Sequence, residues 1–115
     1  MDLEDIRRYC LSKAAATEEI KFEHLLCFCV LGKIFFAISL DEQPLSGTGK
    51  VGQEAFELWM DRPDFMQAPY FAKRQWVTCT NLNRLAEREG KEFIDLSYQL
   101  VTSRFPKKTR QEYNW

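Results

Sequence analysis

Apolar side chains recur at helical spacing near the start of the chain. Leu3, Ile6 and Cys10 are three or four positions apart, which places them on one face of a helix, and the residues between them are mostly charged. Asp2 directly precedes Leu3 and is a favourable N-cap, because its carboxylate can accept a hydrogen bond from a free backbone N–H. The pattern predicts a first helix that begins at Leu3 and ends near Ala15.

Two short, almost wholly apolar runs follow this helix. Residues 25–30 and 34–40 are rich in Phe, Ile and Val, and Gly32 lies between them. Glycine adopts positive φ at little cost, so it suits the turn of a hairpin, whereas it would weaken one continuous helix. The runs predict two paired strands, and because both are apolar on each side, both faces of the pair should be covered.

The next segment contains SGTGK, residues 46–50, which invites comparison with a phosphate-binding loop. The Walker pattern requires glycine at position 44 and serine or threonine at position 51, but Pro44 and Val51 stand there. We therefore predict a turn or an edge strand over residues 46–50, and no nucleotide-binding loop.

A second helix and a second hairpin are expected in the middle of the chain. The helix covers residues 52–61 and stops before Pro63. Its apolar stripe consists of Ala55, Phe56, Trp59 and Met60. The runs 65–71 and 75–80 then have strand composition and flank the segment AKRQ. We predict an antiparallel pair with this segment at its tip.

The tip of the second hairpin is basic and has an aromatic residue on each side. Lys73 and Arg74 lie in the turn, and Tyr70 and Trp76 flank it. Cations that contact a phosphate backbone, beside rings that stack on bases, are typical of proteins that bind single-stranded nucleic acid. An ordinary solvated turn has the same composition, so both interpretations stay open.

The last apolar stripe predicts a long helix toward the carboxyl end. Asn81 is a candidate N-cap for a short lead-in that contains Leu82 and Leu85. The buried face of the helix should consist of Phe93, Ile94, Ser97, Leu100 and Val101. Gly90 is a candidate interruption of this helix, and Pro106 ends it.

The length of 115 residues and the apolar content of 45% indicate a folded domain with one core rather than a disordered chain. No repeat or linker divides it, so we assign residues 1–115 to a single domain, with residues 110–115 as a tail. The four cysteines stand at positions 10, 27, 29 and 79, in apolar segments and without C-x-x-C spacing. We expect buried free thiols rather than disulfides or metal ligands.

No apolar run reaches the roughly 18 residues needed to cross a bilayer, and the acidic start of the chain is unlike a signal peptide. We therefore expect no membrane association and a cytoplasmic location. His24 is the only histidine and has no evident acid–base partner. We expect no catalytic site, no cofactor and no metal.

Several segments, taken in order, resemble the MmcQ/YjbR family of small bacterial proteins. They are LEDIRRYCLS at the start, GKIFFAI in the first hairpin, Lys50 before the second helix, APYFAKRQWV across the second hairpin, and SYQLVTSRFPKK near the end. The resemblance extends from about residue 3 to residue 110. It implies a CyaY-like α+β fold, in which a curved antiparallel sheet packs against about three helices, and a double-wing DNA-binding role.

Charge is distributed unevenly along the chain, although the formal net charge is only −1. Residues 1–72 have 7 basic and 12 acidic side chains, whereas residues 73–110 have 9 basic and 4 acidic ones. Phosphate contacts supply most of the non-specific affinity for nucleic acid, so the basic second part favours DNA as a partner. The candidate DNA-contacting residues are Lys33, Lys73, Arg74, Trp76, Lys107, Lys108 and Arg110.

Two observations oppose DNA binding. The sequence pI of about 5.9 is far below the values above about 9 that are typical of DNA-binding domains. The run RFPKKTR, residues 104–110, also fits the last turn of a helix, where cations offset the partial negative charge of unpaired carbonyls. A small-molecule or protein-interaction domain is the alternative, and the aromatic residues Tyr113 and Trp115 offer a contact for a homodimer.

Overall fold

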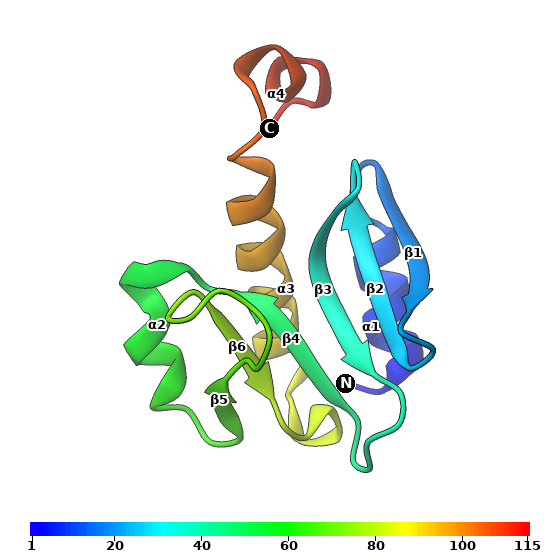
Figure 1. The fold of residues 1–115 in the computed structure, drawn as a ribbon, viewed down its shortest axis with the longest axis vertical. Helices are drawn as coiled ribbons and strands as arrows, with labels where there is room; N and C mark the ends of the chain where they lie inside the picture. Colours follow the sequence, from blue (N-terminus) through cyan, green and yellow to red (C-terminus); the bar gives the residue numbers. More distant parts are fainter.

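The chain has an α+β order, in which groups of consecutive strands lie between helices. The computed structural model describes residues 1–115. Its strands are β1 (Ala16–Lys21), β2 (Leu25–Val30), β3 (Lys33–Ser39), β4 (Ser46–Lys50), β5 (Phe65–Gln67) and β6 (Trp76–Cys79). Its helices are α1 (Leu3–Leu11), α2 (Gly52–Met60), the short 3₁₀ helix η1 (Leu82–Arg84), α3 (Glu87–Thr102) and α4 (Lys107–Tyr113). The strands form one antiparallel sheet in the order β1-β2-β3-β4-β6-β5 (Figure 1), which confirms the predicted fold class.

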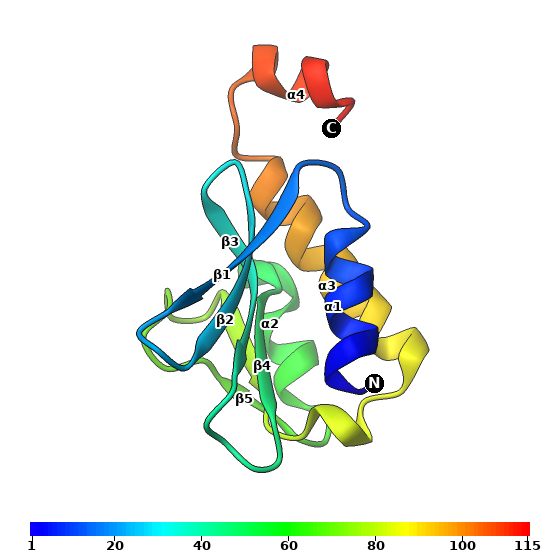
Figure 2. The ribbon, with the colours of Figure 1, turned by 90° about the vertical axis from the view of Figure 1, so that its right-hand side faces the viewer.

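The helices α1 and α3 lie on the same side of the twisted sheet (Figure 2). At the centre of the core between them and the sheet, Phe93 of α3 contacts three other rings. The centroids of Phe36, Trp59 and Phe65 are 5.4, 5.1 and 5.3 Å from that of Phe93. Because Trp59 belongs to α2, this aromatic cluster joins α2 to the same core.

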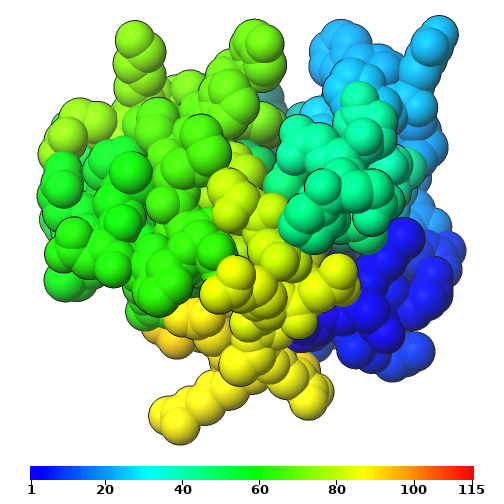
Figure 3. Space-filling model, turned by 90° about the horizontal axis from the view of Figure 1, so that it is seen from below, coloured from blue at the N-terminus to red at the C-terminus, as the bar shows by residue number.

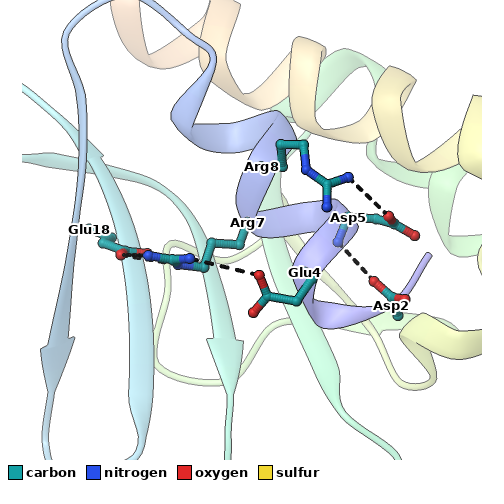
Figure 4. Close-up of polar contacts among 6 residues, drawn as sticks. All are labelled: Asp2, Glu4, Asp5, Arg7, Arg8 and Glu18. Carbon is teal, nitrogen blue, oxygen red and sulfur yellow. Dashed lines mark hydrogen bonds and ion pairs between the residues drawn. The ribbon is translucent and has the colours of Figure 1, made fainter.

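The first helix begins where the sequence predicts and ends earlier. Asp2 caps it, because its Oδ1 atom accepts a hydrogen bond from the Asp5 backbone N–H at 2.8 Å (Figure 4). The helix stops at Leu11 rather than near Ala15. The chain turns there toward β1, and Ala15 adopts a positive φ of 60° that a helix does not allow.

Arg7 connects α1 to the outer strand β1. Its guanidinium donates hydrogen bonds to the carboxylate of Glu18, including one from Nε to Oε2 at 2.7 Å (Figure 4). Glu4 lies on the other side of the same guanidinium at 3.8 Å. The hydrogen bonds from Arg7 lower the pKa of the Glu18 carboxyl, and the Glu18 carboxylate raises the pKa of Arg7. Both partners of this partly buried pair are therefore held in their charged forms.

The predicted first hairpin is confirmed. β2 and β3 pair antiparallel, and Leu31 and Gly32 form the turn with positive φ values of 48° and 82°. Glycine at the second turn position makes this conformation accessible without steric cost. The turn brings Lys33, the first residue of β3, to one end of the sheet.

A β-bulge changes which side chains of β3 face the helices. Phe28 lies opposite Phe36, whereas the next residue, Cys29, lies opposite Ile34, so Phe35 is an extra residue in β3. Phe35 and Phe36 both belong to the core beneath the helices. Ile34 packs on the other face of the sheet.

That other face is also covered, as predicted. Cys27, Cys29 and Ala37 are buried there, and Phe71 packs against them. All four cysteines are buried free thiols, which confirms the prediction. Burial raises the pKa of Cys27 to about 11, so this thiol stays uncharged at neutral pH and behaves as a small apolar group.

The structure corrects the prediction for residues 46–50. SGTGK forms β4, an inner strand that pairs with β3 on one side and β6 on the other, not a turn or an edge strand. Two glycines make the close packing possible. A Cβ atom on Gly47 would lie 2.9 Å from the ring of Phe36, and one on Gly49 would lie 2.9 Å from the ring of Phe93. Aromatic rings therefore occupy the space that side chains of β4 would otherwise need.

The second helix is confirmed as α2, and the second hairpin as the antiparallel pair of β5 and β6. β5 is shorter than the predicted strand over residues 65–71. Residues 68–75 form a loop instead, in which Tyr70 and Arg74 adopt positive φ values of 68° and 61°. A regular strand does not contain such conformations.

The long helix α3 continues through Gly90 without interruption, because this glycine is buried against Met1 and Leu85. α3 ends at Thr102, before the predicted end, and Pro106 instead precedes the additional helix α4. The interpretation of RFPKKTR as the last turn of a long helix is therefore wrong.

The N-terminus closes the end of the molecule opposite α4. The Met1 amino group donates hydrogen bonds to the backbone carbonyl oxygens of Leu82, at 3.1 Å, and Leu85. Seen from this end, the segment that leads into α3 lies between α1 and the region of α2 (Figure 3). No helix in the molecule is both long and apolar enough to cross a membrane.

Candidate functional site

A pocket of about 450 Å³ opens where the β2–β3 turn approaches the C-terminal end of α3. Both features lie toward the α4 end of the molecule (Figures 1 and 2). The lining residues are Lys21, Gly32, Lys33, Ile34, Lys50, Phe71, Trp76, Val101, Arg104 and Phe105. Four of them are cationic, three are aromatic and none is acidic, so we call this hollow the cationic pocket.

Segments far apart in the sequence supply the four cations. Lys33 begins β3, Lys50 ends β4, and Arg104 follows the end of α3. Lys21 ends β1, and its ammonium lies 3.4 Å from the carboxylate of Glu19 on the same strand. Because β3 is paired with β4 and α3 packs on both strands, these distant positions meet at one pocket.

Three of these cations have no carboxylate partner. None of the ion pairs in the molecule includes Lys33, Lys50 or Arg104. Burial lowers the pKa of the Lys50 ammonium, and the nearby positive charge of Arg104 lowers it further. An anion between these two side chains would offset both effects. The electrostatics of the pocket therefore favour an anionic ligand.

Stacked rings form the apolar part of the pocket. The centroids of Phe71 and Trp76 are 4.7 Å apart, and their planes are tilted by 32°. Phe105 stacks on Trp115 with a centroid distance of 5.6 Å. The Nε1 atom of Trp115 donates a hydrogen bond to the Tyr98 hydroxyl at 3.0 Å. Trp115, which we assigned to a terminal tail, thus packs on its own chain behind one wall of the pocket.

Ser97 of α3 supports the pocket from inside the core. Its buried hydroxyl donates a hydrogen bond to the Phe35 carbonyl oxygen at 2.5 Å and accepts one from the Lys50 backbone N–H at 2.7 Å. Phe35 is the bulged residue of β3, and Lys50 ends β4. One hydroxyl therefore fixes α3 against both strands at the position from which the Lys50 side chain enters the pocket.

Of the seven residues proposed from the sequence, Lys33 and Trp76 line the pocket. Lys73 and Arg74 lie in the 68–75 loop beside it. Lys73 is exposed and takes part in no ion pair, whereas the Arg74 guanidinium lies 2.8 Å from a carboxylate oxygen of Glu57. Arg74 is thus partly neutralised, and Lys73 is not.

The other three proposed residues belong to α4. Lys107 and Lys108 are exposed in its first turn, directly after the pocket residue Phe105 and Pro106. Cations at a helix N-terminus face the positive end of the helix dipole, so local helix stability does not explain them. Arg110 is different, because its Nε atom donates a hydrogen bond to the Phe105 carbonyl oxygen at 3.0 Å.

The pocket also contains five residues that the sequence did not mark as candidates, namely Lys21, Lys50, Phe71, Arg104 and Phe105. Arg104 and Phe105 belong to the RFPKKTR run that attracted attention, but the run alone does not indicate which of its members face the same hollow. Lys50 was noted only as part of SGTGK and as one of the positions that resemble the MmcQ/YjbR family. Each of the two lysines is the last residue of its strand, Lys21 of β1 and Lys50 of β4, and many solvated strand ends have a lysine at this position.

The other residues considered for chemistry lie elsewhere. His24 is exposed, and its Nδ1 atom lies 2.6 Å from the Phe22 carbonyl oxygen. No group of three or more histidine, cysteine, aspartate or glutamate side chains is arranged to hold a metal ion. The cationic pocket is therefore the candidate functional site.

Comparisons with known proteins give the following matches. A family model described as YjbR matches residues 11–100. The crystal structure of a Deinococcus radiodurans protein with a DUF419 domain is similar, with a TM-score of 0.86 and 28% identity over 97% of this chain and 87% of that one. A Pseudomonas syringae protein that is 20% identical has the same fold, with a TM-score of 0.72 over 87% of this chain and 98% of that one. No curated protein matches the chain.

Proposed function

The chain belongs to the YjbR family, and we propose that it is a non-catalytic module that binds single-stranded nucleic acid at the cationic pocket. The observation that carries this proposal is the juxtaposition of Lys33, Lys50 and Arg104, all without carboxylate partners, with the rings of Phe71 and Trp76. Uncompensated cations attract the phosphate backbone, and exposed ring faces stack on unpaired bases.

The low pI does not oppose this proposal, because local rather than total charge governs contact with phosphate. At about 0.15 M salt, exposed charges are screened beyond roughly 8 Å. Many of the acidic side chains are engaged elsewhere in the molecule. Arg62, for example, contacts both Glu89 and Glu92, at 3.1 and 3.2 Å.

A single strand fits the pocket better than a duplex does. The bases of a duplex are stacked on one another, so their faces are not accessible to Phe71 or Trp76. Lys107 and Lys108, which directly follow the pocket wall, offer further contacts for a strand that extends beyond it. We assign no catalytic role, because the lining has no carboxylate, histidine, thiol or hydroxyl to form an acid–base pair with Lys50.

Fluorescence anisotropy with a labelled oligothymidylate and a duplex of equal length, at about 0.15 M salt, tests the proposal. The wild type should bind the single strand more tightly than the duplex. The pocket variant, in which Lys33, Lys50 and Arg104 are replaced by alanine, should bind it much more weakly.

A charge-matched control separates the pocket from total charge. It replaces three cations that lie outside the pocket, namely Arg8, Arg84 and Arg88, with alanine. This control should retain most of the affinity. No binding by the wild type, or equal losses in the two variants, would refute the proposal.

Self-association is a second candidate function. β1 is an edge of the sheet, and Ile20 and Phe22 near its end are 53% and 78% exposed. An uncovered edge with apolar side chains can pair with a second copy. Light scattering at two protein concentrations tests this candidate, and an unchanged monomer mass would refute it.

A further inference from the structure

We infer that the cationic pocket is a site for one nucleoside 5′-phosphate, either free or at the end of a strand. This inference rests on the proposed function, because it assigns the ligand of the same pocket. The β2–β3 turn and Phe105 contribute to the walls of this hollow, which is open to solvent and has room for a single nucleotide. Its volume of about 450 Å³ lies within the range of about 300–1,000 Å³ that is usual for small-molecule sites.

The charge of the pocket favours a terminal phosphate over an internal one. Lys33, Lys50 and Arg104 present three cations without carboxylate partners. A phosphate monoester carries a charge of about −1.5 to −2 at neutral pH, whereas each internal phosphate of a strand carries one negative charge. The proximity of Lys50 and Arg104 is unfavourable until an anion lies between them. A monoester offsets this repulsion more completely than a diester does.

The apolar part of the lining suits a base. Phe71 and Trp76 provide ring surface, and Ile34 and Val101 add aliphatic side chains. Inorganic phosphate would leave this surface exposed to water, and an unphosphorylated nucleoside would leave the cations without a partner. A ligand with both a base and a phosphate uses both parts of the lining.

The mode of binding differs from that of a phosphate loop. SGTGK is an inner strand that pairs with β3 and β6, and the Lys50 N–H donates to Ser97, so this segment does not form a loop of free N–H groups for a phosphate. Lys50 contributes its ammonium from the end of that strand. The phosphate is therefore held by side chains from β3, β4 and the segment after α3.

Quenching of tryptophan fluorescence tests the inference with adenosine 5′-monophosphate, adenosine and inorganic phosphate as probes. We expect the monophosphate to bind more tightly than either of the other two. The variant Trp76→Leu should weaken its binding roughly 5- to 150-fold, which is the usual effect of losing one base–ring stack. Tyr70→Leu is the matched control, because Tyr70 is fully exposed in the same loop and outside the pocket.

Calorimetry replaces fluorescence for Trp76→Leu, since this variant lacks the reporting ring. Thermal unfolding checks that each variant is folded. If Trp76→Leu does not fold, Phe71→Leu replaces it as the variant that loses a ring from the pocket. Inorganic phosphate that binds as tightly as the monophosphate would overturn the role of the base. Adenosine that binds as tightly would overturn the role of the phosphate.

Two oligothymidylates, one with a 5′-phosphate and one with a 5′-hydroxyl, separate this inference from the proposed function. We expect tighter binding of the phosphorylated strand, and its displacement by adenosine 5′-monophosphate. Equal binding of both strands without displacement would overturn the inference and leave the proposed function standing. Binding of the monophosphate without binding of either strand would refute the proposed function alone, and binding of neither would refute both.

Discussion

The arginines of α1 each have a carboxylate within reach, whereas three of the four cations of the pocket, Lys33, Lys50 and Arg104, have none. Arg7 donates hydrogen bonds to Glu18, and this contact raises the pKa of Arg7. Lys50 has no such partner, and burial together with Arg104 lowers its pKa. The two pKa shifts have opposite directions because the surroundings of the two side chains differ, and not because of their charge, since both are cations.

This difference explains how a chain with a net charge of −1 can present a cationic site. Arg7 and Arg8 each have an acidic neighbour within α1, at 3.8 and 3.5 Å. Such paired cations contribute little to the electrostatic field of the protein at distances beyond their acidic partners. Lys33, Lys50 and Arg104 in the pocket act outward because no carboxylate partner neutralises them. The following predictions test this contrast.

The largest expected effect concerns the salt dependence of binding. For a single strand, the pocket variant should lower the slope of log affinity against log salt by about 2.1, which corresponds to three lost phosphate contacts. Replacing Lys107, Lys108 and Arg110 with alanine should lower it by only about 1.4, because Arg110 is engaged with the Phe105 carbonyl oxygen. Anisotropy titrations at several salt concentrations measure both slopes.

An unchanged slope for the pocket variant would remove its three cations from the phosphate contacts. If replacing Lys107, Lys108 and Arg110 lowers the slope more than the pocket variant does, the principal phosphate contacts lie on α4 rather than in the pocket. The Arg8, Arg84 and Arg88 variant provides the baseline, because it removes the same number of positive charges.

The next effect concerns the support of the pocket. Ser97→Ala should lower the free energy of unfolding by about 1–3 kcal/mol, because it leaves the Lys50 N–H and the Phe35 carbonyl without this buried partner. Urea unfolding measures the change. Ser103→Ala removes an exposed hydroxyl that contacts the Leu100 carbonyl oxygen, and it should change the stability by less than about 0.5 kcal/mol. Equal losses in the two variants would contradict the role assigned to Ser97.

A smaller effect is expected in the pH dependence of nucleic-acid binding. The pKa of Lys50 is lowered, so this ammonium loses its proton at a lower pH than an ordinary lysine, whose pKa is about 10.4. The affinity of the wild type should therefore fall as the pH rises from about 7 toward 10. Lys50→Arg should show a weaker fall, because arginine stays charged. Parallel pH profiles would contradict a contact between Lys50 and the ligand.

The smallest effect is expected for the ion pair between Arg7 and Glu18, in the pH dependence of stability. The pKa of Glu18 is lowered in the folded state, so its pair with Arg7 stabilises the fold above the ordinary carboxyl pKa of about 4.3. This contribution is lost as the pH falls through the lowered pKa of the folded state. Urea unfolding should show the wild type to be more stable than Glu18→Gln at pH 7, with a difference that disappears in acid. Glu54→Gln, at an exposed position outside every ion pair, should show no such dependence.

The elements that the sequence predicts best are those whose signal is local. The stripe around Phe56 and Trp59 identifies α2, and the apolar runs around Gly32 identify the first hairpin, because helix and strand periodicities involve neighbouring residues. The prediction for residues 46–50 was wrong, since glycine-rich segments rarely form inner strands. There, rings from Phe36 and Phe93 fill the space beside the glycines, which local composition does not reveal.

The candidate site was only partly predictable for the same reason. Lys33 and Trp76 attracted attention as a cation and an aromatic at hairpin ends, and both line the pocket. Lys50 and Arg104 were not selected as site residues, because their importance depends on each other and they are 54 positions apart in the chain. Arg74 was selected, but Glu57 of α2 lies beside it.

By itself, the sequence determined α1, α2 and α3, the two hairpins, the burial of the cysteines and the resemblance to one family, but not α4. Each of these follows from short-range periodicity or from motifs in a fixed order. Tertiary structure decided that β4 is an inner strand and that Lys50 and Arg104 meet without a carboxylate. Electrostatic compensation depends on distances of a few ångströms between side chains from distant segments, and a linear count of charges does not contain those distances.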